Sequence, residues 1–168
     1  MKLILFRHGL AVEREAFFLK NPDDSQRPLV PKGRARTRMM GQILQKRLAK
    51  VDMVVTSPYL RSLETAKILG QILKPTSFHE SVELIPSGPP QAFAAWLKSK
   101  AGAATTIVAV GHEPQLSLFA TWSLSGYLES FIELKKSGAI CLAVENFEEY
   151  GPKSAELKWH LQPQFFEG

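Results

Sequence analysis

The chain is 168 residues long, 45% of them hydrophobic, with a formal net charge of +5. This length predicts one domain, residues 1–168, with a substantial core, and leaves too little chain for a second domain of ordinary size. The longest apolar runs, residues 3–6 and 105–110, fall far short of the roughly 20 residues of a membrane span, and the start lacks the pattern of a signal peptide, so we expect a cytoplasmic protein that does not enter membranes.

Apolar runs alternate with helical patterns along the chain, which predicts an α/β fold. The first half is expected to contain, in chain order, strand 2–7, polar loop 14–29, helix 31–48, strand 51–56 and helix 59–73. The second half is expected to contain a short edge strand within 77–84, a helix after the prolines at 89–90, strand 105–110, helix 114–124, and two antiparallel edge strands, 138–146 and 155–163. Strands that are apolar on both faces predict a three-layer α/β/α sandwich with a mostly parallel central sheet.

Much of the positive charge is concentrated in the segment 32–50, which carries seven basic residues: Lys32, Arg34, Arg36, Arg38, Lys46, Arg47 and Lys50. Such a segment could attract nucleic acid or an acidic protein. It is also typical of the solvated face of a helix whose arginines serve a phosphate pocket. Because no zinc-finger pattern, RNP-like aromatic motif or basic heptad accompanies it, we do not expect nucleic-acid binding.

Polar clusters follow three of the predicted strands, at the points where the strands end. Residues 7–9 (Arg-His-Gly) follow the first strand, residues 57–61 the second and residues 111–113 (Gly-His-Glu) the third. Ligands of open α/β sheets gather outside the carboxyl ends of the strands, so we expect the three clusters to converge. Taken singly, an Arg-His pair at a strand end is a solvated or capping pair, and a lone loop histidine is a satisfied loop residue.

Together, two arginines and two histidines suit a dianionic phosphoryl group. The arginine fork matches phosphate oxygens and stays charged, and a neutral imidazole is a competent nucleophile near pH 7. The second nitrogen of the attacking ring needs an acceptor, for which a backbone carbonyl just past Gly9 could serve. Gly9 itself is expected to permit a turn that a residue with a side chain would resist.

The clusters also resemble a known family. "FRHG" at the end of a first strand, "TSPYLRSLETA" opening a helix after a second strand and "VGHEP" after a later strand are similar to the three hallmarks of the histidine phosphatase superfamily, which has the phosphoglycerate mutase-like fold. The short length, "RPLVPKG" at 27–33, "VELIPSG" at 82–88 and the strand-rich tail resemble the SixA-type phosphohistidine phosphatases. The resemblance covers essentially the whole chain.

This resemblance implies roles for individual residues. His8 would be the nucleophile that forms a phosphohistidine intermediate, and His112 would donate a hydrogen bond to the phosphoryl group in the transition state. Three arginines would hold phosphoryl oxygens: Arg7, Arg27 and Arg61. Ser57 would either support the pocket or cap the helix that begins near Pro58. The arrangement requires no metal or other cofactor, and the lone Cys141 is expected to be a buried thiol.

The sequence offers two carboxylates as candidates for the acid that would protonate the leaving group. In larger relatives an inserted segment or the residue after the second histidine supplies the acid, and this chain carries Glu113 after His112. Glu113 is therefore a candidate acid, and equally a surface carboxylate in the first turn of a helix. Glu83 is a second candidate.

Leaving-group chemistry favours an N-phosphorylated substrate. Phosphohistidine releases imidazole, whose conjugate acid has a pKa near 6.5, whereas an alkoxide needs a positioned acid. The short chain also lacks long lids that would enclose a small metabolite. We therefore expect a monomeric phosphatase that acts on a histidine-containing phosphotransfer domain or phosphocarrier and releases inorganic phosphate. The alternatives are a small-molecule phosphomonoesterase that uses Glu113 as acid, and a catalytically silent phosphate-binding module.

Overall fold

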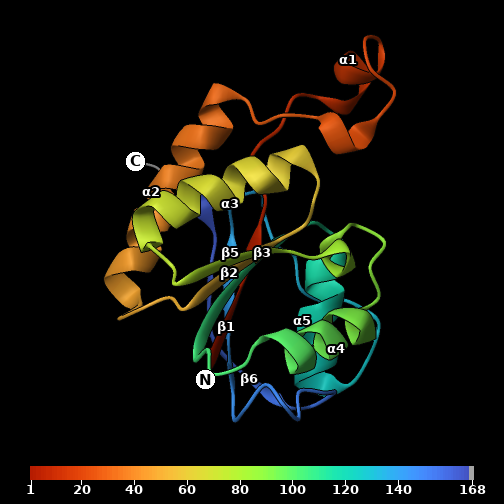
Figure 1. The fold of residues 1–168 in the computed structure, drawn as a ribbon. Coiled ribbons are helices and arrows are strands. Elements are labelled where there is room, and N and C mark those ends of the chain that lie inside the picture. The colour runs from red at the N-terminus through yellow and green to blue at the C-terminus, as the bar shows by residue number, and fades with distance from the viewer. Residues whose placement is uncertain (167–168) are drawn as a thin grey trace.

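A computed structural model describes residues 1–166, in which six strands form one mixed sheet in the order β3-β2-β4-β1-β5-β6 (Figure 1). The strands are β1 (Lys2–Arg7), β2 (Met53–Thr56), β3 (Ser77–Glu80), β4 (Thr106–Gly111), β5 (Ala139–Val144) and β6 (Ala155–Leu161). The helices are α1 (Arg14–Phe18), α2 (Pro31–Arg47), α3 (Leu60–Leu73), α4 (Pro90–Lys100) and α5 (Gln115–Ser125), with 3₁₀ turns η1 (Asp24–Gln26), η2 (Val82–Leu84) and η3 (Pro163–Phe165). Most predicted elements lie within about two residues of these bounds.

The sheet is mostly parallel, as predicted, but the placement of β5 differs from the prediction. β3, β2, β4 and β1 pair in parallel, whereas β5 pairs antiparallel with both β1 and β6. The prediction of two edge strands is wrong for β5, which lies inside the sheet, while β6 forms the edge. The physical reason is that β5 is apolar on both faces and is covered on both: Ile140 packs in one core cluster and Cys141, a buried thiol as predicted, in the other.

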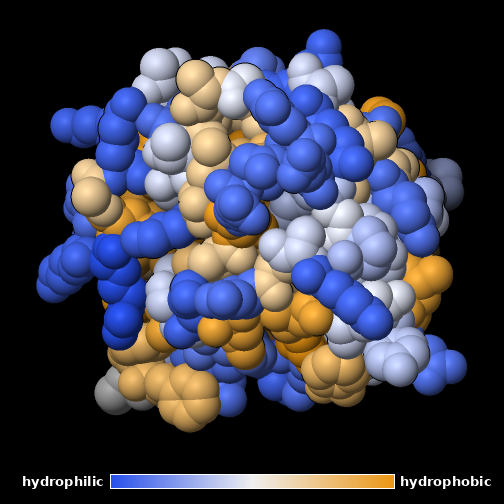
Figure 2. Space-filling view, turned by 90° about the horizontal axis from the view of Figure 1, so that it is seen from below, coloured by the Kyte–Doolittle hydropathy of each residue, from blue (hydrophilic) through white to orange (hydrophobic). Residues whose placement is uncertain are grey.

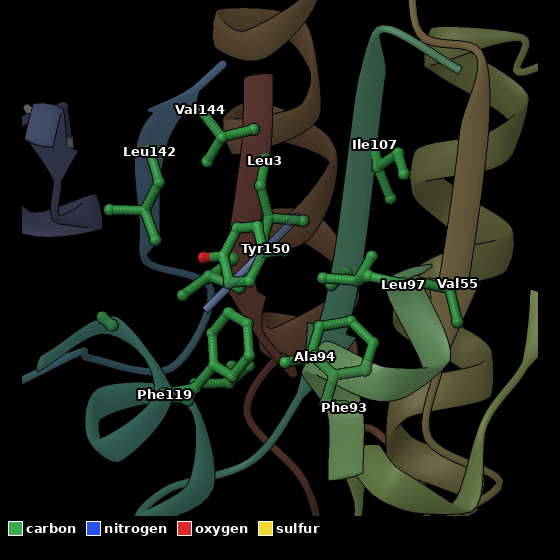
Figure 3. Packing of buried hydrophobic residues seen from close by; sticks show 14 of the residues in the cluster. Leu3, Val55, Phe93, Ala94, Leu97, Ile107, Phe119, Leu142, Val144 and Tyr150 are labelled. Atoms are coloured by element: carbon green, nitrogen blue, oxygen red, sulfur yellow. The ribbon is translucent and has the colours of Figure 1, made fainter. Parts of the chain in front are cut away.

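Helices cover both faces of the sheet, so the predicted three-layer sandwich is confirmed (Figure 1). Side chains alternate along β1, where Leu3 and Leu5 face one layer and Ile4 and Phe6 the other. On the first face α4 and α5 supply the packing residues Phe93, Leu97 and Phe119 (Figure 3). On the second face α2 and α3 supply Met40, Leu44, Ala66 and Leu69. The apolar core therefore fixes the strand ends on which the polar clusters lie.

The segment predicted as the loop 14–29 contains the short helix α1 and the turn η1. α1 has no buried residue, so no apolar periodicity marks it in the sequence. The segment rises above the carboxyl end of the sheet, at the opposite end of the molecule from the first residue (Figure 1). On the face seen from below, hydrophobic residues are scattered among hydrophilic ones (Figure 2). None of the helices within residues 1–166 has the length and apolar content to cross a membrane.

Candidate active site

The carboxyl ends of β1, β2 and β4 bring the three polar clusters to one cleft of about 470 Å³. Strand pairing causes this convergence, because Arg7 lies opposite Gly111 in the β1–β4 register and the His8 N–H donates to the Gly111 carbonyl at 3.0 Å. Six of the predicted site residues line the cleft: Arg7, His8, Arg27, Arg61, His112 and Glu113. Ser57 and Glu83 are not among its lining residues.

His8 is held as a neutral imidazole whose Nε2 carries no proton. Its Nδ1 lies 2.7 Å from the Gly9 carbonyl oxygen, which assigns the ring proton to Nδ1 and the lone pair to Nε2. The carbonyl is that of Gly9 itself, next to the position expected. The Arg61 Nε–H donates to His8 Nε2 at 3.3 Å, consistent with that tautomer. Burial, together with the charges of Arg61 and Arg7, lowers the pKa of His8 to about 3, so the ring is neutral near pH 7.

A glycine is needed at position 9 because α2 packs closely against it. The expected reason, a turn that only glycine adopts easily, is wrong. Its φ does not lie in the left-handed region, so no special turn is involved. A Cβ at this position would lie 2.7 Å from Thr37 Oγ1 and 3.1 Å from the Gly33 carbonyl oxygen. The Gly9 N–H also donates to Thr65 Oγ1 at 3.0 Å. The glycine thus lets the end of β1 approach α2 closely, which fixes the position of His8.

Arg61 and Arg27 are joined by a carboxylate that the sequence analysis missed, Asp24. Arg61 donates through Nη2 to Asp24 Oδ2 at 2.9 Å and through Nη1 to its backbone carbonyl at 2.7 Å. Arg27 Nε donates to Asp24 Oδ1 at 3.0 Å. Burial opposes ionisation of Asp24, but the two arginines outweigh it and lower its pKa. The spacing of three residues between Asp24 and Arg27 is the signal that could have revealed the pair.

Arg7 reaches the cleft from the end of β1. Its Nη1 donates to the Leu134 carbonyl at 2.7 Å, which anchors the side chain on the segment before β5. Its Nε is buried and has no partner among the described residues. Burial lowers the pKa of this guanidinium, although the carboxylates of Glu113 and Glu133 oppose the effect. Arg7 thus remains able to donate to an anion in the cleft.

His112 lies beside His8, with 4.9 Å between the ring centroids. Its Nε2 lies 2.9 Å from Ser57 Oγ and 3.1 Å from Ser62 Oγ, and burial lowers its pKa. Ser57 Oγ accepts the Tyr59 N–H at 3.4 Å, so its own hydrogen is available for His112 Nε2. We infer that the ring proton is on Nδ1, which is buried and has no partner among residues 1–166.

Ser57 therefore lies behind His112 and does not face the cleft. Tyr59 is the N-cap residue of α3, without a side-chain capping bond, so the capping interpretation of Ser57 is wrong. Ser62 makes the equivalent contact from the first turn of α3 and was missed in the sequence. Its position directly after Arg61 in "LRSLET" is the signal that could have indicated it.

Removing both serine hydroxyls is expected to lower kcat. In the Ser57→Ala/Ser62→Ala variant no hydroxyl donates to Nε2, so the tautomer of His112 is no longer fixed and its Nδ1 carries the proton for only part of the time. We expect a loss of roughly tenfold, the size of one hydrogen bond. Steady-state kinetics would measure it, with Ser81→Ala as the matched control, since the buried Ser81 donates to Glu83 instead. Unchanged kcat in the double variant would contradict the assignment.

The structure brings one of the two candidate acids to the cleft. Glu113 lines it, one of its carboxylate oxygens is buried without a partner among the described residues, and burial raises its pKa. Glu83 accepts a hydrogen bond from Ser81 at 2.6 Å and lies outside the cleft lining. Of the two candidate acids, Glu113 therefore lies at the cleft and Glu83 does not.

Comparisons of the sequence with known proteins agree with this geometry. Residues 3–85 match the family model of the histidine phosphatase superfamily (branch 1). An uncharacterised protein of Picosynechococcus is 38% identical over 146 residues, 84% of each chain. The phosphohistidine phosphatase SixA of Escherichia coli is 31% identical over 117 residues, 68% of each chain.

Solved structures share the fold. The protein histidine phosphatase SixA complexed with tungstate superimposes with a TM-score of 0.84 at 23% identity, over 99% of this chain and 100% of that one. The alpha-ribazole phosphatase from Shigella flexneri superimposes with a TM-score of 0.72 at 18% identity, over 97% of each chain. The fold is the phosphoglycerate mutase-like fold, and the chain belongs to the histidine phosphatase superfamily, within which it is of the SixA type.

Proposed function

We propose that this protein hydrolyses phosphohistidine on other proteins through a covalent phosphohistidine intermediate on His8. Membership of the histidine phosphatase superfamily supports phosphatase activity, and the similarity to SixA supports phosphohistidine as the substrate. The observation that carries the covalent step is the tautomer of His8. Its Nδ1–H is bound to the Gly9 carbonyl, which leaves Nε2 unprotonated at the cleft, where its lone pair accepts the Arg61 Nε–H at 3.3 Å until a phosphoryl group takes its place.

In the first step, His8 Nε2 attacks phosphorus, an N–P bond forms, and the bond to the leaving imidazole breaks with its electron pair. The side chains of Arg7, Arg27 and Arg61 hold the phosphoryl oxygens, and His112 Nδ1–H donates to one of them. In the second step, water attacks phosphorus and the N–P bond to His8 breaks. The proton of water passes to Glu113 or to solvent, inorganic phosphate leaves, and neutral His8 is restored.

The preference for phosphohistidine follows from its leaving group. Protonation of the second ring nitrogen of the substrate, which titrates as an imidazole does, lets the ring depart as a neutral molecule, so no acid is needed at the nitrogen that leaves phosphorus. Arg14, Arg27 and Arg61 are among the arginines that line the cleft beside His8. Their positive charge stabilises the phosphoryl group in the transition state, which is the stabilisation that the reaction still needs. A silent binding module would have no use for a neutral, oriented nucleophile.

A small-molecule phosphomonoesterase is the second candidate, and Glu113 is the observation that favours it. A half-buried carboxyl with a raised pKa is suited to protonate an alkoxide. Assays on four substrates separate the two functions: a phosphohistidine protein, free phosphohistidine, a sugar phosphate and para-nitrophenyl phosphate. We expect phosphate release from the phosphohistidine protein and little from the two esters. Faster release from the sugar phosphate would overturn the proposal.

Glu113→Gln is expected to affect the two substrate classes differently. The amide cannot donate a proton as an acid does, so hydrolysis of an ester should fall by roughly a hundredfold. Hydrolysis of phosphohistidine should change by less than about threefold, because imidazole leaves without an acid. Parallel kcat measurements on phosphohistidine and on the sugar phosphate, whose alkoxide needs a proton to leave, check this. Glu83→Gln, outside the cleft, is the matched control, and equal losses on both substrates would contradict the leaving-group argument.

A further inference from the structure

Lys136 lines the catalytic cleft together with His8 and the arginines. It lies in the turn directly before β5, and its side chain is partly buried. The positive charge of its ammonium group contributes to the lowered pKa of His8. Lys136 therefore lies within electrostatic reach of the imidazole that would attack phosphorus.

The turn that carries Lys136 is bonded to the backbone of the nucleophile. The Ser137 N–H donates to the carbonyl oxygens of Arg7 at 3.1 Å and of His8 at 3.2 Å, and the Gly138 carbonyl accepts the Arg7 N–H at 3.0 Å. Ser137 has a φ of 63°, in the left-handed region that a residue with a side chain seldom adopts. The backbone of Lys136 is therefore fixed beside the cleft, while its four-carbon side chain stays flexible.

The ammonium group of Lys136 has no hydrogen bond and no ion pair within residues 1–166, unlike two of the guanidinium groups beside it. Arg27 and Arg61 both bind the carboxylate of Asp24. Glu13, which also lines the cleft, attracts Lys136, but the two side chains do not form an ion pair. The three N–H donors of Lys136 are therefore available to a ligand of the cleft.

A charge at position 136 does not stabilise the fold. Burial lowers the pKa of Lys136, and the charges of Arg7, Arg27 and Arg61 lower it further, although Glu13 opposes this. A partly buried ammonium group that three guanidinium groups repel destabilises the folded protein. A dianionic phosphoryl group in the cleft would attract all four cations, so the position of Lys136 favours a role in binding over a role in folding.

We propose that Lys136 is a phosphoryl-binding residue, whose ammonium group donates a hydrogen bond to an oxygen of the phosphoryl group that His8 accepts. This inference rests on the proposed function and adds a fourth cation to the three arginines that hold the phosphoryl oxygens. Hydrogen bonds to the protein hold the arginines in place, whereas an ammonium group on a flexible stem can follow the oxygens as phosphorus moves to His8 Nε2. Lys136 stays protonated throughout and transfers no proton.

Lys136→Met tests the proposal, because methionine is unbranched and uncharged. At pH 7 we expect the Kd of inorganic phosphate, measured by calorimetry, to rise roughly tenfold, the loss of one charge-assisted hydrogen bond. The KM for a phosphohistidine protein should rise with it. Without phosphate, the midpoint of thermal unfolding should stay equal or rise, because the repulsion by the arginines is removed. Lys136→Arg, which keeps the charge, should bind phosphate more tightly than Lys136→Met.

Lys135→Met is the matched control. It makes the same charge change at the neighbouring position, where Lys135 is paired with Glu133 and does not line the cleft, so the Kd of phosphate should stay at the wild-type value. An equal rise of the Kd in this control would mean general electrostatic attraction and would overturn the proposal. A lower midpoint of unfolding in Lys136→Met would also overturn it, because the charge would then support the fold.

Phosphate binding and hydrolysis separate this inference from the proposed function. A wild type that binds phosphate more tightly than Lys136→Met, yet releases none from a phosphohistidine protein, would refute the function and retain the role of Lys136. Hydrolysis by the wild type together with an unchanged Kd of phosphate in Lys136→Met would retain the function and refute the role of Lys136.

Discussion

His8→Ala is expected to abolish both turnover and covalent labelling by a radiolabelled phosphohistidine protein. Nε2 of His8 is the atom that would form the N–P bond, and without it the arginines can bind the phosphoryl group but cannot accept it. We expect activity to fall by more than roughly a thousandfold. Brief incubation, rapid denaturation and detection of an acid-labile label on the wild type, together with phosphate release, would measure the two losses.

A second variant separates catalysis from folding. His8→Gln keeps a polar side chain in a site that is 5% exposed, and it should bind phosphate while remaining unlabelled. Because the pKa of His8 falls from 6.5 to about 3 on folding, the unfolded chain binds a proton between these values that the folded protein does not. The free energy of unfolding therefore decreases as the pH falls from 6.5 toward 3, and His8→Gln should make this decrease shallower. Equal labelling of wild type and His8→Gln would place the intermediate elsewhere.

The parts of the fold that the sequence could predict are those with a repeating apolar pattern. Leu3 to Phe6 alternate between the two core clusters, and such runs mark a strand buried on both faces. The polar residues directly after these strands could be placed at one edge because parallel strands end together. The sequence pattern did not give the position of β5 in the sheet, because pairing partners are not encoded in the periodicity of one strand.

The supporting residues of the site were harder to find for a different reason. Asp24 lies in the short 3₁₀ turn η1 and Lys136 in a turn before β5, where no apolar period relates them to the cleft. Only the long-range folding of the chain brings Asp24 to Arg61 and Lys136 to the lining that it shares with Arg7. Ser62 lies on a helix, but its orientation toward His112 depends on how α3 meets the end of β4. Gly9 could be singled out from the sequence, but a glycine is needed there because a Cβ would come too close to Thr37 and Gly33. The local sequence does not show that these two residues are neighbours of Gly9.

Arg61→Ala is expected to produce the second large loss of activity. One guanidinium donates to His8 Nε2 and to both the carboxylate and the carbonyl of Asp24, and the side chain is 3% exposed. Its removal takes a fixed positive charge from the phosphoryl site and leaves Asp24 facing the cleft with less compensation. We expect kcat/KM to fall by at least roughly a hundredfold, and competitive inhibition by inorganic phosphate to weaken in parallel.

Arg61→Lys decides whether charge or geometry accounts for this loss. Lysine restores the charge, but a single ammonium cannot reach His8 and both acceptors of Asp24 at once, so we expect it to recover less than about a tenth of the lost activity. Arg34→Lys is the matched control, because Arg34 forms its ion pair with Glu64 at 2.5 Å outside the cleft. Full activity in Arg61→Lys would show that charge alone suffices. A persistent loss in a folded variant would show that the planar fork, held in place by Asp24, aligns the phosphoryl group with Nε2 of His8.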